Sequence, residues 1–172
     1  MYETNLYLDA LSEMKIVYLS KSLEIYLKTL IKTAYPEIDT KPFYLFDKMI
    51  SFFKSKSIEI DKLKGFIEFS ELRKVNNSIK HSSLLSEEVK KISEFKGKSE
   101  HNSLSLDLFH DRVKPKIELF KEDIAEEIIK ELFEFNNERL VNLVKVFSNR
   151  MNVGSFRNFS KKIFEELKTK NH

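Results

Sequence analysis

Glycine and proline, the residues that most often interrupt regular structure, are scarce in this chain. It has three of each among 172 residues. A β-sheet protein of this length needs many tight turns, and tight turns draw heavily on these two residues. The scarcity therefore favours long helices, and the length suits one all-α domain, residues 1–172, with a substantial core.

Apolar residues recur at helical spacing along most of the sequence. In the second predicted helix the stripe is made of Phe43, Phe46, Ile50 and Phe53, which we interpret as core residues rather than as contacts to a ligand. The same spacing, with candidate caps and proline stops, predicts an all-α bundle of five to six helices at about 5–34, 42–55, 61–80, 115–148 and 155–169.

The segment 82–106 breaks this pattern. Ser86 can start a short helix there, and residues 95–105 are expected to form a loop. Further along, Asn136–Asn137 is expected to bend a helix, and Ser155 to cap the terminal one. Helices of this length with apolar surface left over favour a homodimer, and a folded-back bundle is the alternative.

Composition excludes several classes of protein. The chain has no cysteine, so it has neither disulfides nor thiolate metal sites, which fits a reducing compartment. Acidic residues but no Lys or Arg precede Lys15, the reverse of a secretory signal. No stretch approaches 18 apolar residues free of charge, as a membrane span would require. The sequence therefore predicts a cytoplasmic protein with no membrane partner.

Charge is distributed unevenly along the chain, although the net charge is only +3. Residues 107–138 carry ten acids and five bases, whereas residues 139–172 carry eight bases and two acids. Residues 41–65 carry six Lys and three acids. Such segments are either solvated helix faces or parts of a polar interaction surface, and the sequence leaves both interpretations open.

Most catalytic and metal-binding patterns are missing. There is no Gly-rich phosphate loop, and His101 and His110 have no ligand partner at a fixed helical spacing. We therefore expect no metal and no cofactor. The acids of one later segment alternate with its apolar stripe and are expected to face solvent rather than to hold metals: Asp123, Glu126, Glu127, Glu131 and Glu134.

The stretch ELRKVNNSIKHS, residues 71–82, has the composition of a reactive site. Arg73, Asn77 and His81 are four residues apart, so a helix places them on one side, with Asn76 and Lys80 beside them. Histidine transfers protons near neutral pH, and Arg or Lys holds a phosphate and stabilises developing charge. The same residues are also common at the end of a helix, where they cap carbonyl groups.

This stretch resembles the motif of the HEPN superfamily, small all-α proteins with an Arg-(Asn/His/Asp)-x-x-x-His sequence on a later helix. Asn77 takes the place of the family's Asn, His81 that of its His, and Lys80 before the His is common in divergent members. Asn76 stands where the family has Arg, so Arg73, one turn earlier, would have to supply the charge. The resemblance covers about residues 5–150.

The resemblance implies a metal-independent ribonuclease site, formed where two copies of the chain bring their motifs together. It would make His81, Asn77 and Arg73 catalytic, and Arg73, Asn76 and Lys80 binding residues for RNA. The implied function is that of a weak or inactive ribonuclease, or an RNA-binding protein, of a bacterial toxin or phage-defence system. The alternative is a non-enzymatic helical module for dimerisation or for binding another protein.

Overall fold

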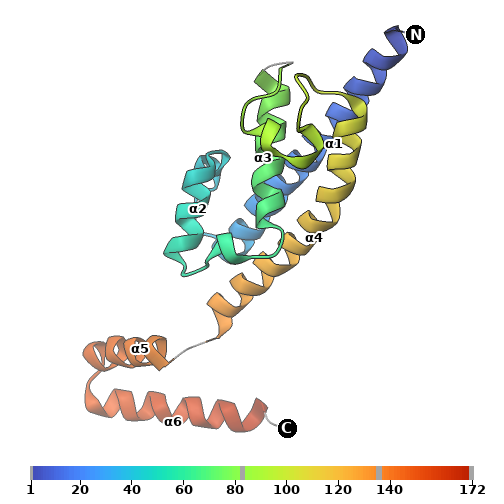
Figure 1. Ribbon diagram of the computed structural model, residues 1–172. Helices are drawn as coiled ribbons and strands as arrows, with labels where there is room; N and C mark the ends of the chain where they lie inside the picture. Colours follow the sequence, from blue (N-terminus) through green and yellow to red (C-terminus); the bar gives the residue numbers. More distant parts are fainter. Residues whose placement is uncertain (1, 82–83, 135–136, 171–172) are drawn as a thin grey trace. The chain divides into compact units, whose positions relative to one another are not determined.

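All regular structure in the described part of the chain is helical (Figure 1). This computed structural model describes residues 2–81, 84–134 and 137–170. Its α-helices are α1 (Tyr2–Ala34), α2 (Phe46–Ser55), α3 (Phe66–His81), α4 (Ser103–Phe133), α5 (Asn137–Arg150) and α6 (Val153–Lys170). The prediction of an all-α protein of five to six helices is confirmed.

The chain divides into two compact units, Met1–Leu132 and Phe133–His172. In the first unit α1 and α4 run in the same direction. Residues in contact between the two helices are separated by nearly the same number of positions at both ends, 94 near the start and 95 further along. The backbone NH of Ser103 donates to Asp9 (2.6 Å), and the hydroxyl of Tyr26 donates to the carbonyl of Lys121 (3.0 Å). These two helices form the long side of the unit.

Helix α3 runs in the opposite direction to α4 and packs against it. Near its start the ring of Phe69 stacks on Phe120, with 4.9 Å between centroids. Gly65, just before the helix, has a φ of +77°, and a Cβ there would lie 2.1 Å from the carbonyl oxygen of Lys116. Only glycine tolerates both the conformation and this contact.

The prediction that this helix begins at residue 61 is wrong. Residues Ile60–Lys62 form a 3₁₀ turn, and the α-helix begins at Phe66, after Gly65. Glycine in the left-handed region turns the chain toward α4 before the helix starts. Gly65 is thus a close packing point rather than a residue of the first helical turn.

The core lies where α1, α3, α4 and the turns after α3 meet. Burying each large side chain contributes roughly 1.5–3 kcal/mol. The largest fully buried side chains include four phenylalanines and residues from α1, α3 and α4: Phe53, Phe95, Phe109, Phe120, Ile16, Leu23, Leu27, Ile31, Leu72, Leu106 and Ile117.

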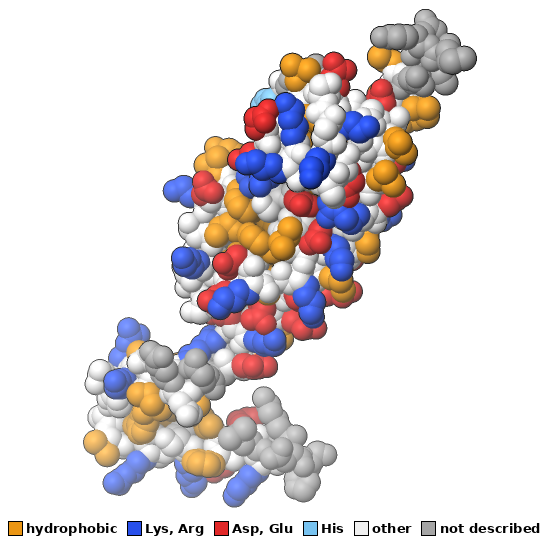
Figure 2. All heavy atoms as spheres, in the orientation of Figure 1, with side chains coloured by type: hydrophobic (Ala, Val, Ile, Leu, Met, Phe, Trp, Pro, Cys, Tyr) orange, Lys and Arg blue, Asp and Glu red, His pale blue; other side chains and the backbone are white. Residues whose placement is uncertain are grey.

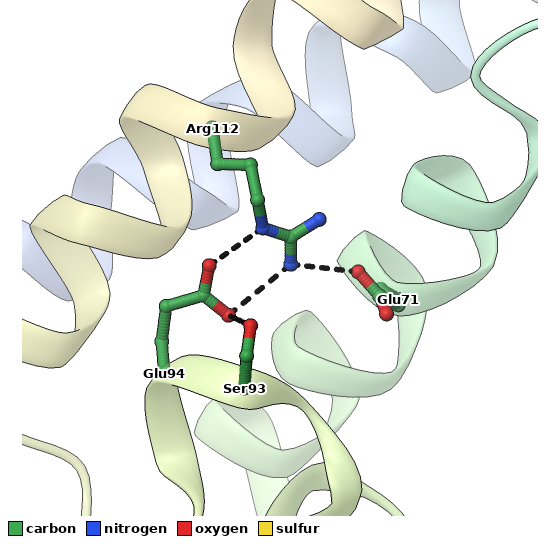
Figure 3. Close-up of polar contacts among 4 residues, drawn as sticks. All are labelled: Glu71, Ser93, Glu94 and Arg112. Carbon is green, nitrogen blue, oxygen red and sulfur yellow. Dashed lines mark hydrogen bonds and ion pairs between the residues drawn. The ribbon is translucent and has the colours of Figure 1, made fainter.

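An ion pair network ties α4 to α3 and to a turn between them (Figure 3). The guanidinium of Arg112 on α4 donates to Glu71 on α3 (2.8 Å) and to Glu94 (2.5 and 3.2 Å). Ser93 also donates to Glu94 (2.7 Å). Burial opposes the ionisation of Glu94, but the hydrogen bonds from Arg112 and Ser93 outweigh it and lower the pKa of this carboxyl.

The predicted start of a helix near residue 115 is wrong by about three turns. Helix α4 begins at Ser103, and Pro115 lies inside it. Asn102 caps the helix, since its side-chain oxygen accepts from the backbone NH of Ser105 (3.0 Å). Leu106 and Phe109 are buried and continue the apolar stripe N-terminal to the proline. The helix therefore gains enough packing to keep a proline within it.

Three other predicted boundaries also differ. The second helix is preceded by a separate 3₁₀ turn, Lys41–Tyr44. In place of a short helix from Ser86, two 3₁₀ turns follow, Val89–Lys91 and Ser93–Phe95. At the start of α6, Asn152 rather than the predicted Ser155 is the cap, because its side chain accepts from the backbone NH of Ser155 (2.9 Å). The prediction of one helix over 115–148 is wrong, because α4 ends at Phe133 and α5 begins at Asn137. The bend predicted at Asn136–Asn137 falls partly on residue 136, outside the described residues.

The second unit contains the antiparallel pair α5 and α6. Phe147 and Phe159 are in contact, with 4.9 Å between ring centroids. None of the described side chains of these two helices is fully buried. None of the helices in the described part of the chain has an apolar stretch of the length that a bilayer crossing requires.

Candidate anion-binding cleft

A cleft of about 560 Å³ lies in the first unit and takes its lining from α1, α3 and the segment 43–49. All five residues singled out in the sequence line it. The complete lining is Ser20, Leu23, Glu24, Leu27, Phe43, Tyr44, Leu45, Phe46, Asp47, Met49, Phe69, Leu72, Arg73, Asn76, Asn77, Lys80 and His81. The structure therefore brings the polar end of α3 to one concave surface.

Arg73 is the half-buried cation of this cleft. Its guanidinium carbon lies 3.6 Å from the centroid of the Phe46 ring, a cation–π contact that fixes the side chain. Burial lowers the pKa of Arg73, and the negative charge of Asp47 opposes that effect. Among the described residues no carboxylate lies within ion-pair distance of Arg73. Its charge is therefore not held in an ion pair, although two carboxylates, Asp47 and Glu24, line the same cleft.

Asn76 lies deeper in the cleft, with 6 % of its surface exposed. Its side-chain oxygen is buried and has no hydrogen-bond partner among the described residues. A buried polar atom without a partner costs free energy and is uncommon in folded proteins. Asn77, the next residue, is exposed at the rim.

His81 and Lys80 are exposed at the end of α3. His81 also lines a neighbouring hollow of about 520 Å³, together with Asn77 and Ser78. A helix rises about 1.5 Å per residue, so His81 lies about 12 Å beyond Arg73 along the axis. Lys80 is therefore the nearest cation to His81 on this helix.

His101 and His110, which the sequence analysis set aside as metal ligands, have contacts within the first unit. His101 is partly buried, with Nε2 3.1 Å from the hydroxyl of Ser78, and burial lowers its pKa. His110 contacts Asp111 (3.2 Å). The described residues contain no group of three or more side chains that could hold a metal ion.

Sequence reasoning missed the part of the cleft that comes from α1 and from the segment before α2. Phe46 was assigned to a core stripe, yet one face of its ring supports Arg73. Asp47 and Tyr44 come from the same segment, and Ser20 and Glu24 from α1. No local pattern signals these residues, because they reach the cleft only through tertiary packing.

Comparison of the chain with protein-family models, with curated proteins and with solved structures found no match. The resemblance to the HEPN superfamily therefore stays a prediction, and the geometry of the cleft is the basis for the function proposed below.

Proposed function

We propose that this protein acts on RNA, binding a single strand in the cleft of the first unit and cleaving it slowly at best. The observation that carries the proposal is Arg73, a half-buried guanidinium that lines the cleft without a carboxylate partner. Lys80 and His81 line the same cleft. An unpaired, partly desolvated cation beside two further basic side chains suits a phosphate.

The cleavage chemistry needs only groups that the cleft contains. His81 would take the proton of a ribose 2′-hydroxyl, and the 2′-oxygen would attack the adjacent phosphorus while the bond to the 5′-oxygen breaks. Water would give a proton to the departing 5′-oxygen, so the products would be a 2′,3′-cyclic phosphate, a 5′-hydroxyl and a hydroxide ion that takes the proton back from His81. Lys80 would stabilise the charge that develops on the phosphate, while Asn77 would orient it.

The proposed activity is weak because the arrangement is incomplete. Asn76 occupies the position at which the family motif has Arg, and Arg73 is about 12 Å from His81 along the helix axis. Loss of one charge-stabilising donor typically costs about 10²–10³ in rate. RNA binding without measurable turnover is therefore within the proposal.

The test measures cleavage of a labelled single-stranded RNA in the presence of EDTA. We expect a slow reaction that His81→Ala removes and that Asn76→Arg accelerates, because Arg restores a cation one turn before Lys80. Lys98→Ala, an exposed lysine outside the cleft, is the control and should leave the rate unchanged. RNA that neither binds to nor is cleaved by the wild-type protein would contradict the proposal.

A second candidate function, an interaction module, is favoured by a different surface. A groove of about 970 Å³ lies between α1 and the start of α4. Figure 2 shows hydrophobic side chains along this edge of the unit. The exposed apolar residues on these two helices include Tyr7, Leu8, Leu11, Met14, Tyr18, Ile25, Leu104 and Leu108. Contiguous apolar surface of this kind marks a protein interface.

We propose that a second copy of the chain covers this face. Residues 2–14 of α1 carry acids and no Lys or Arg, whereas residues 15–34 carry four Lys and one acid. Two copies of α1 packed antiparallel about a two-fold axis would place each acidic half against the basic half of its partner. The charge pattern thus complements itself in a homodimer.

A further inference from the structure

We infer that Asn76 recognises the edge of one unpaired nucleobase held in the cleft, an inference that rests on the proposed RNA-binding function. The observation behind it is the buried side-chain oxygen of Asn76, which has no hydrogen-bond partner among the described residues and belongs to a side chain that lines the cleft.

The side-chain oxygen of Asn76 has no structural contact among the described residues that explains it. Its oxygen accepts no hydrogen bond from the backbone, so it is not a cap. An apolar side chain of similar size, such as Leu, would fill the same volume beside Leu72 without leaving a buried polar atom unpaired. An amide at this place is therefore best explained by a ligand that pairs with it.

The surroundings of Asn76 point to a nucleotide. Arg73 and Lys80 precede and follow it by about one turn on α3, and both line the cleft. They offer positive charge to the phosphates on either side of a nucleotide. Phe43 and Phe69 are also among the lining residues and make part of the cleft wall apolar.

The size of the cleft, about 560 Å³, is in the range of small-molecule sites and suits one nucleotide rather than a duplex. An asparagine amide pairs with the edge of a base through one donor and one acceptor. That edge is accessible only when the base is unpaired. Asn76 thus determines which base is preferred, whereas Arg73 contributes binding affinity that does not depend on the base.

The experiment compares binding of four labelled RNA octamers that are all uridine except for one central A, C, G or U. Fluorescence anisotropy is measured for the wild-type protein, Asn76→Leu and Arg73→Gln. Asn142→Leu is the matched control, because Asn142 is an exposed asparagine on α5, outside the lining of the cleft. Thermal unfolding of each variant verifies that it is folded.

We expect the wild type to prefer one central base by roughly fivefold or more, since a bidentate pair discriminates by about 1–3 kcal/mol. Asn76→Leu should bind the four octamers equally, and Asn142→Leu should keep the preference. Arg73→Gln should weaken all four by a similar factor.

Two results would overturn the inference, and they are distinguishable. Equal binding of all four octamers by the wild type, or a preference that survives in Asn76→Leu, would refute base recognition by Asn76 while weaker binding by Arg73→Gln still supports the proposed function. No binding of any octamer by the wild type would overturn the proposed function and this inference together.

Discussion

Two arginines of this chain have opposite electrostatic surroundings. Arg112 donates to two carboxylates, Glu71 and Glu94, which raise its pKa and hold α4 against its neighbours. Arg73 instead lies on the ring of Phe46, without a carboxylate partner among the described residues. Sequence could not distinguish them, because Glu71 is two residues from Arg73 and yet pairs with Arg112. The distinction arises only from the packing of α3 on α4.

Asn76 is expected to reduce the stability of the fold. Leaving a buried polar group unpaired costs about 1–3 kcal/mol, so Asn76→Leu should raise the free energy of unfolding, by about 1 kcal/mol once strain from the new side chain is included. Urea denaturation followed by circular dichroism measures the change. Asn77→Leu, at the exposed rim, should stay within about 0.5 kcal/mol of wild type. A destabilised Asn76→Leu protein would show that the amide has a structural role.

At the scale of the helices, prediction succeeded where the apolar spacing was continuous. The end of α1 at Ala34 and the end of α2 at Ser55 are confirmed, since proline or a loss of spacing follows each. It failed at the start of α3, predicted at residue 61, and at the start of α4, predicted near residue 115. Gly65 precedes α3 and Pro115 lies inside α4. Both residues are instead placed by the packing of α3 on α4, which a local pattern does not contain.

The candidate site, too, was predicted in part from local spacing and in part not predicted. Helical spacing was sufficient to place Arg73, Asn77 and His81 on one side of α3, and these residues line one cleft. The burial of Asn76 and the ring beneath Arg73 depend on α1 and on the segment before α2. Contacts between such distant segments cannot be obtained from spacing within one helix.

The ion pair between α4 and the turn at residue 94 should make stability depend on pH. Because the pKa of Glu94 is lowered in the folded state, the stabilisation is present above its ordinary value of about 4.5 and is lost as the pH falls through the lowered pKa. At pH 7, Glu94→Gln should lose about 1–2 kcal/mol, a figure that allows for the partial solvation of Arg112.

Thermal unfolding between pH 3 and pH 7 checks this expectation. Wild type should lose more stability over this range than Glu94→Gln. Glu87→Gln is the control, because Glu87 also has a lowered pKa through Lys90 but is exposed. Parallel pH curves for wild type and Glu94→Gln would show that the pair contributes no net stability.

At the scale of the whole chain, the first unit has two separate surfaces that could bind a partner. The first unit has the cleft on one side of α1 and the apolar groove on another, with Leu27 lining the former and Tyr18 the latter. A dimer formed through the groove would leave the cleft open. Such a dimer would differ from the arrangement implied by the family resemblance, in which two motifs meet at the interface.

We expect a homodimer in solution, with a mass about twice the 20.4 kDa of the chain. Tyr18→Glu should yield a monomer, because Tyr18 lies midway along α1 in the groove, where a two-fold axis would bring the two introduced charges together. Light scattering at tens of micromolar protein measures both masses. Ile67→Glu, at an exposed site on α3, should remain dimeric. A monomeric wild type would contradict the proposed interface.

The most direct test of the central claim is to map where RNA contacts the protein. The ¹H–¹⁵N resonances of the full chain would be followed by NMR while a single-stranded RNA octamer is added. We predict saturable shifts in two stretches, residues 69–81 of α3 and 43–49, and their loss in Arg73→Gln. Shifts confined to α5 and α6, or none at all at millimolar RNA, would contradict the claim that this cleft binds RNA.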